Sequence, residues 1–220
     1  NTLYGTAHWP DRDYSLYAKE SYMKNVIVFR CINYISMDVA QVKWKLFRQI
    51  NGENEEIVTD EINRILKRAN PEESFVYIIQ KAISYLLMSG NCYFEKISIK
   101  KNNKEIIKEL YILRPDKMKI NINKTTGLIE NYEYDNKIKF EVDPITKKSD
   151  ILHIKLFHPL DDFFGLSITE PTAREIDSSN EATEWQKKVF ENEGRPGMML
   201  FVSGFLSDEQ FDRLERQLRN

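Results

Sequence analysis

Apolar side chains recur at helical spacing between Ser74 and Ser89, which predicts a helix with one continuous apolar face. The residues of that face are Phe75, Ile78, Ile79, Ala82, Ile83, Leu86 and Leu87. Gly90 follows at once, and glycine is the residue that most readily takes the left-handed conformation after a last helical turn. We therefore expect the main core helix of the chain to end at Gly90.

Two further helices and a strand are expected before this one. The helix from Tyr22 to about Ala40 carries Ile27, Cys31, Tyr34 and Ile35 on one face, with Val28, Ile32 and Val39 close by. A short amphipathic helix from Thr59 to Arg68 should end at Asn70-Pro71, because proline disfavours the helical conformation in the residue before it. Between these helices, apolar residues alternate with lysines from Val42 to Leu46, which predicts a strand with one buried face.

The pattern changes between Cys92 and Phe157, where short runs of alternating apolar and polar residues follow one another. Pairs of turn-forming residues such as Asn-Asn, Thr-Gly, Asp-Asn and Asp-Pro separate the runs. This arrangement predicts an antiparallel meander. With helices on both sides of it in the sequence, the expected fold class is α+β.

A long helix is expected between Thr169 and Glu193, with Thr169 as the N-cap and a glycine and proline stop signal after it. Its 25 residues correspond to about 37 Å at 1.5 Å per residue. The middle of the helix, Arg174 to Glu181, contains one large apolar side chain, Ile176, and the other apolar residues lie near the two ends. Such a polar waist is typical of a helix that crosses between two bodies or lines a wet space. After this helix, a strand is expected from Met198 to Val202, and another helix is expected to start over Ser207 to Arg219.

Composition adds an uneven distribution of charge. The 220 residues are 41% hydrophobic and 30% charged, as in globular proteins, with a net charge of −2. Lys and Arg counted against Asp and Glu give −1 over residues 1–95, +5 over 96–155 and −6 over 156–220, which suggests a charged partner. Two cysteines, Cys31 and Cys92, form no disulfide framework and favour a reducing compartment. No apolar run approaches the ~18–20 residues of a membrane span, so no membrane partner is expected.

Catalytic motifs are largely missing. Gly165-Leu166-Ser167 begins like a nucleophile elbow, but Thr169 stands where the second glycine should be. His153, His158 and Asp162 could form a metal-dependent enzyme, although two histidines five residues apart do not share one face of a strand. Aspartates before a glycine are more often turn formers, and phosphate-binding and dinucleotide-binding motifs are absent. We expect no catalytic residue, metal or cofactor.

The basic β-region supports a second hypothesis, a DNA-binding adaptor. Its lysines could contact phosphates, and they are Lys96, Lys100, Lys101, Lys104, Lys108, Lys117, Lys119 and Lys124. The alternative is a solvated strand face whose lysines protect the sheet edge. The long helix has the opposite character, with seven acidic and three basic residues. DNA could slide past such a surface without adhering to it.

The order of these features resembles the portal (head–tail connector) proteins of tailed bacteriophages and prophages, over about Asn25 to Asn220. The matching residues are Asn25-Val26, Cys31-Ile32, Asp38-Val39-Ala40, Asn70-Pro71, Leu86 to Tyr93, Leu110 to Pro115, Asp150 to Ile154, Asp162, Gly165-Leu166-Ser167, Phe190, Asn192, Pro196 and Gly197. Two positions depart from the family pattern, because Ile168 replaces the usual proline and Glu193 the usual glycine. These departures alter the helix caps and leave the resemblance intact.

The resemblance implies a non-enzymatic ring of twelve subunits at one capsid vertex, through which double-stranded DNA passes during packaging and ejection. It further implies contacts with the large terminase, the capsid protein and a head–tail adaptor, in the virion and in the bacterial host cytoplasm during assembly. The expected parts are an arm (1–21), a portal-like wing domain of helices and meander (22–162), a stem helix (163–194) and the start of a small α/β clip (195–220). The chain begins at Asn1 and its last helical pattern still runs at Asn220, so we expect a fragment.

The resemblance also assigns expected roles to individual residues. Residues expected to face the DNA channel are Glu175, Asp177, Glu181, Glu184 and Lys188. Residues expected at subunit interfaces are Ile176, Trp185, Val189 and Phe190. Residues expected to maintain the structural motifs of the family are Gly90, Asn91, Pro115, His153, Gly165, Ser167, Pro196 and Gly197.

Overall fold

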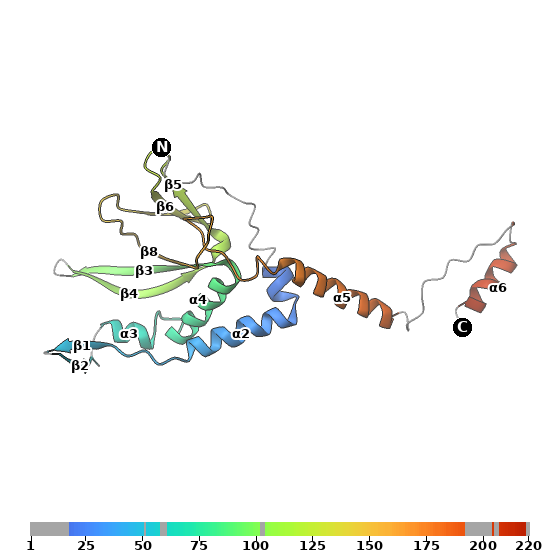
Figure 1. Ribbon diagram of the computed structural model, residues 1–220, viewed down its shortest axis with the longest axis horizontal. Coiled ribbons are helices and arrows are strands. Elements are labelled where there is room, and N and C mark those ends of the chain that lie inside the picture. The colour runs from blue at the N-terminus through green and yellow to red at the C-terminus, as the bar shows by residue number, and fades with distance from the viewer. Residues whose placement is uncertain are drawn as a thin grey trace. The chain divides into compact units, whose positions relative to one another are not determined.

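The computed structural model describes residues 18–50, 52–57, 61–101, 104–191, 204 and 207–218 (Figure 1). The chain divides into two compact units, Asn1–Glu181 and Ala182–Asn220. The expected arm (apart from residues 18–21), the strand expected at 198–202, and Pro196 and Gly197 lie outside the described residues. The mixture of helices and antiparallel strands confirms the α+β class.

Five of the described helical elements lie wholly within the first unit. In chain order they are η1 (Ala18–Met23), α2 (Val26–Ala40), α3 (Glu61–Lys67), α4 (Phe75–Ser89) and the short η2 (Pro115–Lys117). Asn25 caps α2, because its side-chain Oδ1 accepts the backbone N–H groups of Ile27 and Val28 at 3.1 and 3.2 Å. Ser74 caps α4, and Gly90 ends it with a φ of 75°, as the sequence predicted. Helix α5 (Ala173–Glu191) starts in the first unit and ends in the second.

The strands form three separate sheets. β1 (Phe47–Ile50) pairs with β2 (Glu53–Glu56); β3 (Asn91–Lys101) lies between β4 (Lys104–Leu113) and β8 (Ile151–Lys155); and β6 (Ile129–Tyr134) lies between β5 (Met118–Ile122) and β7 (Ile138–Glu141). All described pairings are antiparallel. The single meander that the sequence predicted is therefore wrong, since β8 returns to β3 over about fifty intervening residues. Alternation predicts strands but does not say which strands pair.

Two apolar cores lie on opposite faces of the β4-β3-β8 sheet. One packs α3 and α4 against alternate residues of β3 and β4. Its members include Ile78 and Ala82 of α4 and Cys92 and Phe94 of β3. The other fills the space between this sheet and the β5-β6-β7 sheet, and its members are Tyr93, Met118, Ile120, Tyr132 and Ile151. Figure 1 shows α4 lying between the β3–β4 strands and α2. Adjacent residues of β3, such as Cys92 and Tyr93, thus belong to different cores.

The strand predicted at Val42–Leu46 is displaced. The backbone N–H of Val42 bonds to the carbonyl of Val39, so the residue completes the end of α2. Trp44 packs edge-on against Phe75 at a ring-centroid distance of 6.1 Å. The strand begins instead at Phe47, and both β1 and β2 are exposed on both faces. Trp44 therefore contacts α4 through Phe75, while Val42 and Trp44 both stay more than half exposed, so residues 42–46 do not fill one side of a sheet.

The second unit contains the end of α5 and helix α6 (Asp208–Leu218), which agrees with the helix expected at 207–219. Phe211 is exposed on α6, as are Asp208, Glu209 and Asp212. Among the described residues, no helix combines the length and apolar character that crossing a lipid bilayer requires.

Candidate functional site

The predicted motif residues Gly90, Asn91, His153, Gly165 and Ser167 meet around the C-terminal end of α4. Gly90 uses its backbone here, since its carbonyl accepts the N–H of Leu156 at 2.8 Å. A Cβ atom on Gly90 would overlap the backbone of Gly165, and one on Gly165 would overlap the backbone of Gly90 and Leu156. The two glycines therefore allow two chain segments to lie in direct backbone contact.

Asn91 is the centre of the hydrogen bonds at this junction. Its Oδ1 accepts the backbone N–H of Gly165 at 2.8 Å and lies 3.1 Å from Nε2 of His153. Its Nδ2 donates to the carbonyls of Ser89 at 2.8 Å and Gly165 at 3.4 Å. One buried amide thus connects the end of α4, strand β8 and the segment that leads toward α5.

His153 is held between aromatic rings. Its ring stacks on Tyr93 at 4.3 Å between centroids and meets Tyr132 edge-on at 6.0 Å. Burial, together with the nearby charge of Lys155, lowers the pKa of His153 to about 4. At neutral pH the ring is therefore uncharged, and Nε2 must carry the proton that it donates to Asn91. His153 lies half-buried in strand β8.

Thr169 was expected to cap the long helix, and this prediction is wrong. Its Oγ1 instead donates to the carbonyl of Met88 at 3.1 Å, which fixes the segment to the end of α4. The hydroxyl of Ser167 lies 3.1 Å from Thr169 and accepts the N–H of Glu170 at 3.0 Å. The helix begins at Ala173, four residues later than predicted. Another motif residue, Pro115, starts η2.

The polar waist of α5 does not cross open space. Ile176 and Asn180 are buried, and Nδ2 of Asn25 donates to Oδ1 of Asn180 at 3.2 Å and to Oγ of Ser179 at 3.3 Å. The residue that caps α2 thus also anchors α5. Sequence reasoning missed this link, although an asparagine directly before an apolar helical run is a recognisable N-cap.

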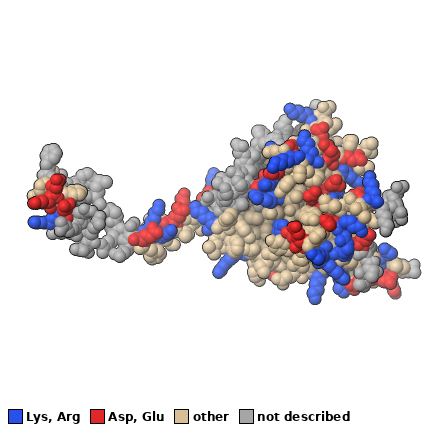
Figure 2. Space-filling model, turned by 180° about the vertical axis from the view of Figure 1, so that it is seen from behind, with Lys and Arg blue, Asp and Glu red and all other residues tan. Residues whose placement is uncertain are grey.

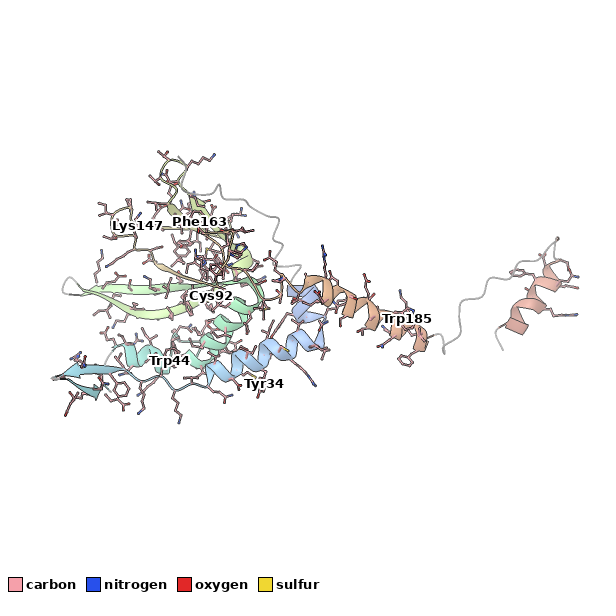
Figure 3. The ribbon with its side chains drawn as sticks, in the orientation of Figure 1. Tyr34, Trp44, Cys92, Lys147, Phe163 and Trp185 are labelled. Carbon is pink, nitrogen blue, oxygen red and sulfur yellow. The ribbon has the colours of Figure 1, made fainter. Side chains whose placement is uncertain are left out.

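The later part of α5 carries most of its exposed apolar surface. Trp185 and Phe190 are 67% and 79% exposed, and Figure 3 labels Trp185 on the helix. Ile176, by contrast, is 8% exposed, so its side chain is used within the chain and offers little surface to a neighbour. The residues expected to face a channel, Glu175, Asp177, Glu181, Glu184 and Lys188, are all exposed. With about 3.6 residues per turn, Glu175 lies on the opposite side of the helix from the other four.

The residues of the metal-enzyme hypothesis have structural partners. His153 bonds to Asn91, and Nδ1 of His158 accepts the N–H of Leu160 at 3.0 Å. Asp161 accepts the N–H groups of Phe163 and Phe164, which makes it a turn former as expected. The backbone carbonyl of Asp162 accepts Nζ of Lys155. Within the described ranges, no three His, Cys, Asp or Glu side chains are grouped so that they could hold a metal ion.

Several lysines of the basic β-region pair with carboxylates. Lys108 lies 3.4 Å from Glu61, and Lys117 and Lys137 flank Asp135 at 3.2 and 3.5 Å. Figure 2 shows positive and negative side chains intermixed over the first unit, without one continuous basic area on this face. The side chains of Lys101 and Lys104 lie outside the described set. This pairing favours a solvated surface over a phosphate-binding one.

Comparisons with known proteins agree with this fold. A sequence model of the family described as "Phage portal protein" matches residues 26–220. The chain therefore belongs to the phage portal protein family. Uncharacterized proteins of Rickettsia bellii (strain RML369-C) and Rickettsia felis (strain ATCC VR-1525 / URRWXCal2) are both 34% identical, over 203 and 204 residues. Each match covers 90% of this chain and 51% of the relative, so the chain spans about half the length of these proteins.

Solved structures of portal and neck chains have a similar fold. A chain of the neck of an empty gene transfer agent (GTA) particle, computed with C6 symmetry, is 27% identical with a TM-score of 0.72, covering 99% of this chain and 58% of that one. A chain of the native GTA neck, computed with C12 symmetry, is 26% identical with a TM-score of 0.70, and the match covers 99% of this chain and 57% of that one. An HK97-family phage portal protein from Corynebacterium diphtheriae shares the fold, at 12% identity and a TM-score of 0.56. The match covers 90% of this chain and 58% of that one.

Proposed function

We propose that the chain is a structural subunit, and not an enzyme, of a portal ring at one vertex of a phage or prophage capsid. The observation that carries the proposal is the similarity to chains of GTA necks described with C12 and C6 symmetry, over nearly the whole of this chain. In this proposal twelve copies surround an axial channel for double-stranded DNA. The ring serves packaging and ejection, and it offers a platform for the large terminase, the capsid protein and the head–tail adaptor.

The parts of the chain have separate roles in this proposal. Residues 22–162 form the wing, 163–194 the stem helix and 195–220 the start of the clip, with residues 1–21 as an arm. The ring is placed in the virion, and in the host cytoplasm while the particle assembles. Native mass spectrometry of the complete protein tests the assembly directly. Twelve-subunit rings are expected, and a monomer at all concentrations would contradict the proposal.

Residues of α5 form the channel surface in this proposal. Asp177, Glu181, Glu184 and Lys188 share one exposed face whose net charge is negative, and like charges repel the phosphates of DNA. Glu175 faces the other side and lies outside this set. Such a surface lets DNA move through the ring without adhering to it.

Charge reversal on this face tests its role. Rings with Asp177→Lys and Glu184→Lys should bind duplex DNA tightly at low salt and release it steeply as salt rises, because each new lysine adds a phosphate contact. Fluorescence anisotropy with labelled duplex DNA measures this. The control carries Glu130→Lys and Glu141→Lys, two exposed acids of the β-region, with the same change in charge. Equal DNA binding by both variants would remove the channel assignment.

Trp185, Val189 and Phe190 form the contact between neighbouring stem helices in this proposal. Trp185 and Phe190 are large, apolar and exposed, and such side chains on a polar helix gain most from burial against a neighbour. Trp185→Asp should therefore reduce ring formation in native mass spectrometry. Lys187→Asp on the same helix is the control, since its ion pair with Glu191 is exposed and contributes little.

A further inference from the structure

Helix α2 carries most of its large apolar side chains on its exposed side. The residues it buries toward α4 are Ile32, Ser36 and Ala40, of which two are small. The opposite side, together with Met23 just before the helix, is named the α2 outer face, and its other members are Val26, Ile27, Tyr34 and Met37. These five side chains are between 48% and 77% exposed. Figure 3 shows Tyr34 on the side of α2 that is turned away from α4.

The sequence predicted that Ile27, Cys31, Tyr34 and Ile35 form one apolar face. The structure buries the other side of the helix, so this apolar face is left uncovered by the described residues. Two small residues on the buried side let α2 approach α4 closely. The exposed side chains of this face thus add little to the core of the first unit, and their apolar character needs another explanation.

The chemistry of the α2 outer face fits a protein partner. Within Val26–Ala40 the charged residues are Arg30 and Asp38, one of each sign. A nucleic acid would require several Lys or Arg side chains for its phosphates, and this face does not supply them. Contiguous exposed apolar surface on a folded chain usually marks a protein interface.

The area of this surface is sufficient for a stable interface. The apolar surface continues from the outer face through Phe29 and Ile35 to Val42 and Trp44, which line a groove of about 400 Å³ beside Leu66 and Val76. These nine side chains, at roughly 100 Å² exposed each, offer on the order of 900 Å², and one partner contributes about 800 Å² to a standard-sized interface.

We infer that the α2 outer face is covered by a neighbouring copy of this chain. The inference rests on the proposed ring, in which a neighbouring copy lies on each side of every subunit. Contacts in a closed ring are heterologous, so each subunit presents one surface to the copy on one side and a different surface to the copy on the other. The α2 outer face supplies one of these surfaces, in addition to the contacts of α5.

Two natural cysteines provide the test. Cys31 is exposed on α2 next to the outer face, whereas Cys92 is buried in the core, where burial raises the pKa of its thiol to about 12. The complete protein is treated with a maleimide as assembled rings and as dissociated subunits, and modification of each cysteine is read by peptide mass spectrometry. Cys31 should react at least tenfold more slowly in rings than in dissociated subunits. Cys92 should stay unmodified in both.

The outcomes separate this inference from the proposed function. Rings in which Cys31 reacts as fast as in dissociated subunits would overturn the inference, while the proposal of a ring would stand. Protection of Cys31 in dissociated subunits that disappears when residues 1–17 are deleted would also overturn it, because the arm of the same chain would then be the occupant. Absence of any ring would overturn both proposals.

Charge substitutions on the α2 outer face provide an independent test. Ile27→Glu combined with Tyr34→Glu should reduce the fraction of subunits in rings at least tenfold, while the circular dichroism spectrum and the Tm of the subunit stay unchanged because both side chains are exposed. Ile145→Glu is the matched control, since Ile145 is 89% exposed in a turn of the β-region. Normal ring formation by the double variant would contradict the inference.

Discussion

Gly90 and Gly165 make the most specific demand on residue type in the described chain. Gly90 has a positive φ, and a Cβ on either glycine would overlap backbone atoms of the other segment, which cannot move as a flexible side chain can. The junction around Asn91 forms only while these two backbones stay in contact. These two positions therefore decide whether the end of α4 can hold the segment that leads to α5.

Substituting these glycines should be costly. Gly90→Ala and Gly165→Ala are each expected to lower the free energy of unfolding by more than about 2 kcal/mol, measured by urea denaturation, because backbone overlap adds to conformational strain. Gly52→Ala is the control. Gly52 also has a positive φ but no atom near its Cβ position, so its cost should stay near ~1 kcal/mol, from strain alone. Equal costs at Gly52 and Gly90 would mean that the backbone contact is unimportant.

His153 should make the stability of the first unit depend on pH. Its pKa in the folded chain is about 4, below the ordinary value near 6.5, so the unfolded chain takes up a proton first as the pH falls. The stabilisation is complete above pH 6.5 and is lost as the pH falls from 6.5 to 4, by up to about 3 kcal/mol. Denaturation curves at pH 7, 5.5 and 4.5 measure this loss.

The variant His153→Gln isolates this contribution. Glutamine can still donate a hydrogen bond to Asn91 but cannot take up a proton, so the decrease between pH 6.5 and 4.5 should become markedly smaller. A wild-type chain whose unfolding free energy is constant over this interval would show that the ring is not held in its neutral form.

At the scale of elements, Asn25 connects two helices that are distant in sequence. Its Oδ1 caps α2, while its Nδ2 bonds to Asn180 and Ser179 of α5. Asn25→Ser should retain the cap and lose the link, whereas Asn25→Ala should lose both, at an added cost of about 1 kcal/mol. In hydrogen exchange, both variants should increase exchange at the start of α5, and only Asn25→Ala should do so at the start of α2. Unchanged exchange in α5 would contradict the link.

Elements with their own end signals could be predicted from the sequence. Helix α4 ends at Gly90 as expected, and the helices around Ala40 and Asp208 were placed within a few residues. Features that depend on distant partners could not be predicted. Thr169 resembles an N-cap locally, but the carbonyl of Met88 competes for its hydroxyl. The apolar residues of α2 gave no indication that the opposite face would be buried, because periodicity identifies a stripe without identifying what covers it.

The same limit applies to the candidate site. Motif residues such as Asn91, His153 and Gly165 were recognised by resemblance, and the structure shows the hydrogen bonds that join them. Ile176 was assigned to a subunit interface by the same resemblance, and the structure buries it within the chain instead. A sequence does not distinguish a residue that contacts its own chain from one that contacts a copy.

At the scale of the whole molecule, the chain leaves apolar surface uncovered on α2 and on the later part of α5. A single subunit has no described element that covers either surface. The proposed ring, which is supported by membership in the portal family and by similarity to neck chains described with cyclic symmetry, would cover both surfaces by contact with identical neighbours. The two surfaces then act together, so loss of either should weaken the ring without unfolding the subunit.

Imaging of the complete protein by electron microscopy tests this account most directly. Class-averaged top views should show a closed ring of twelve copies around a central hole. Particles that remain single subunits or symmetric dimers at every concentration would contradict the account.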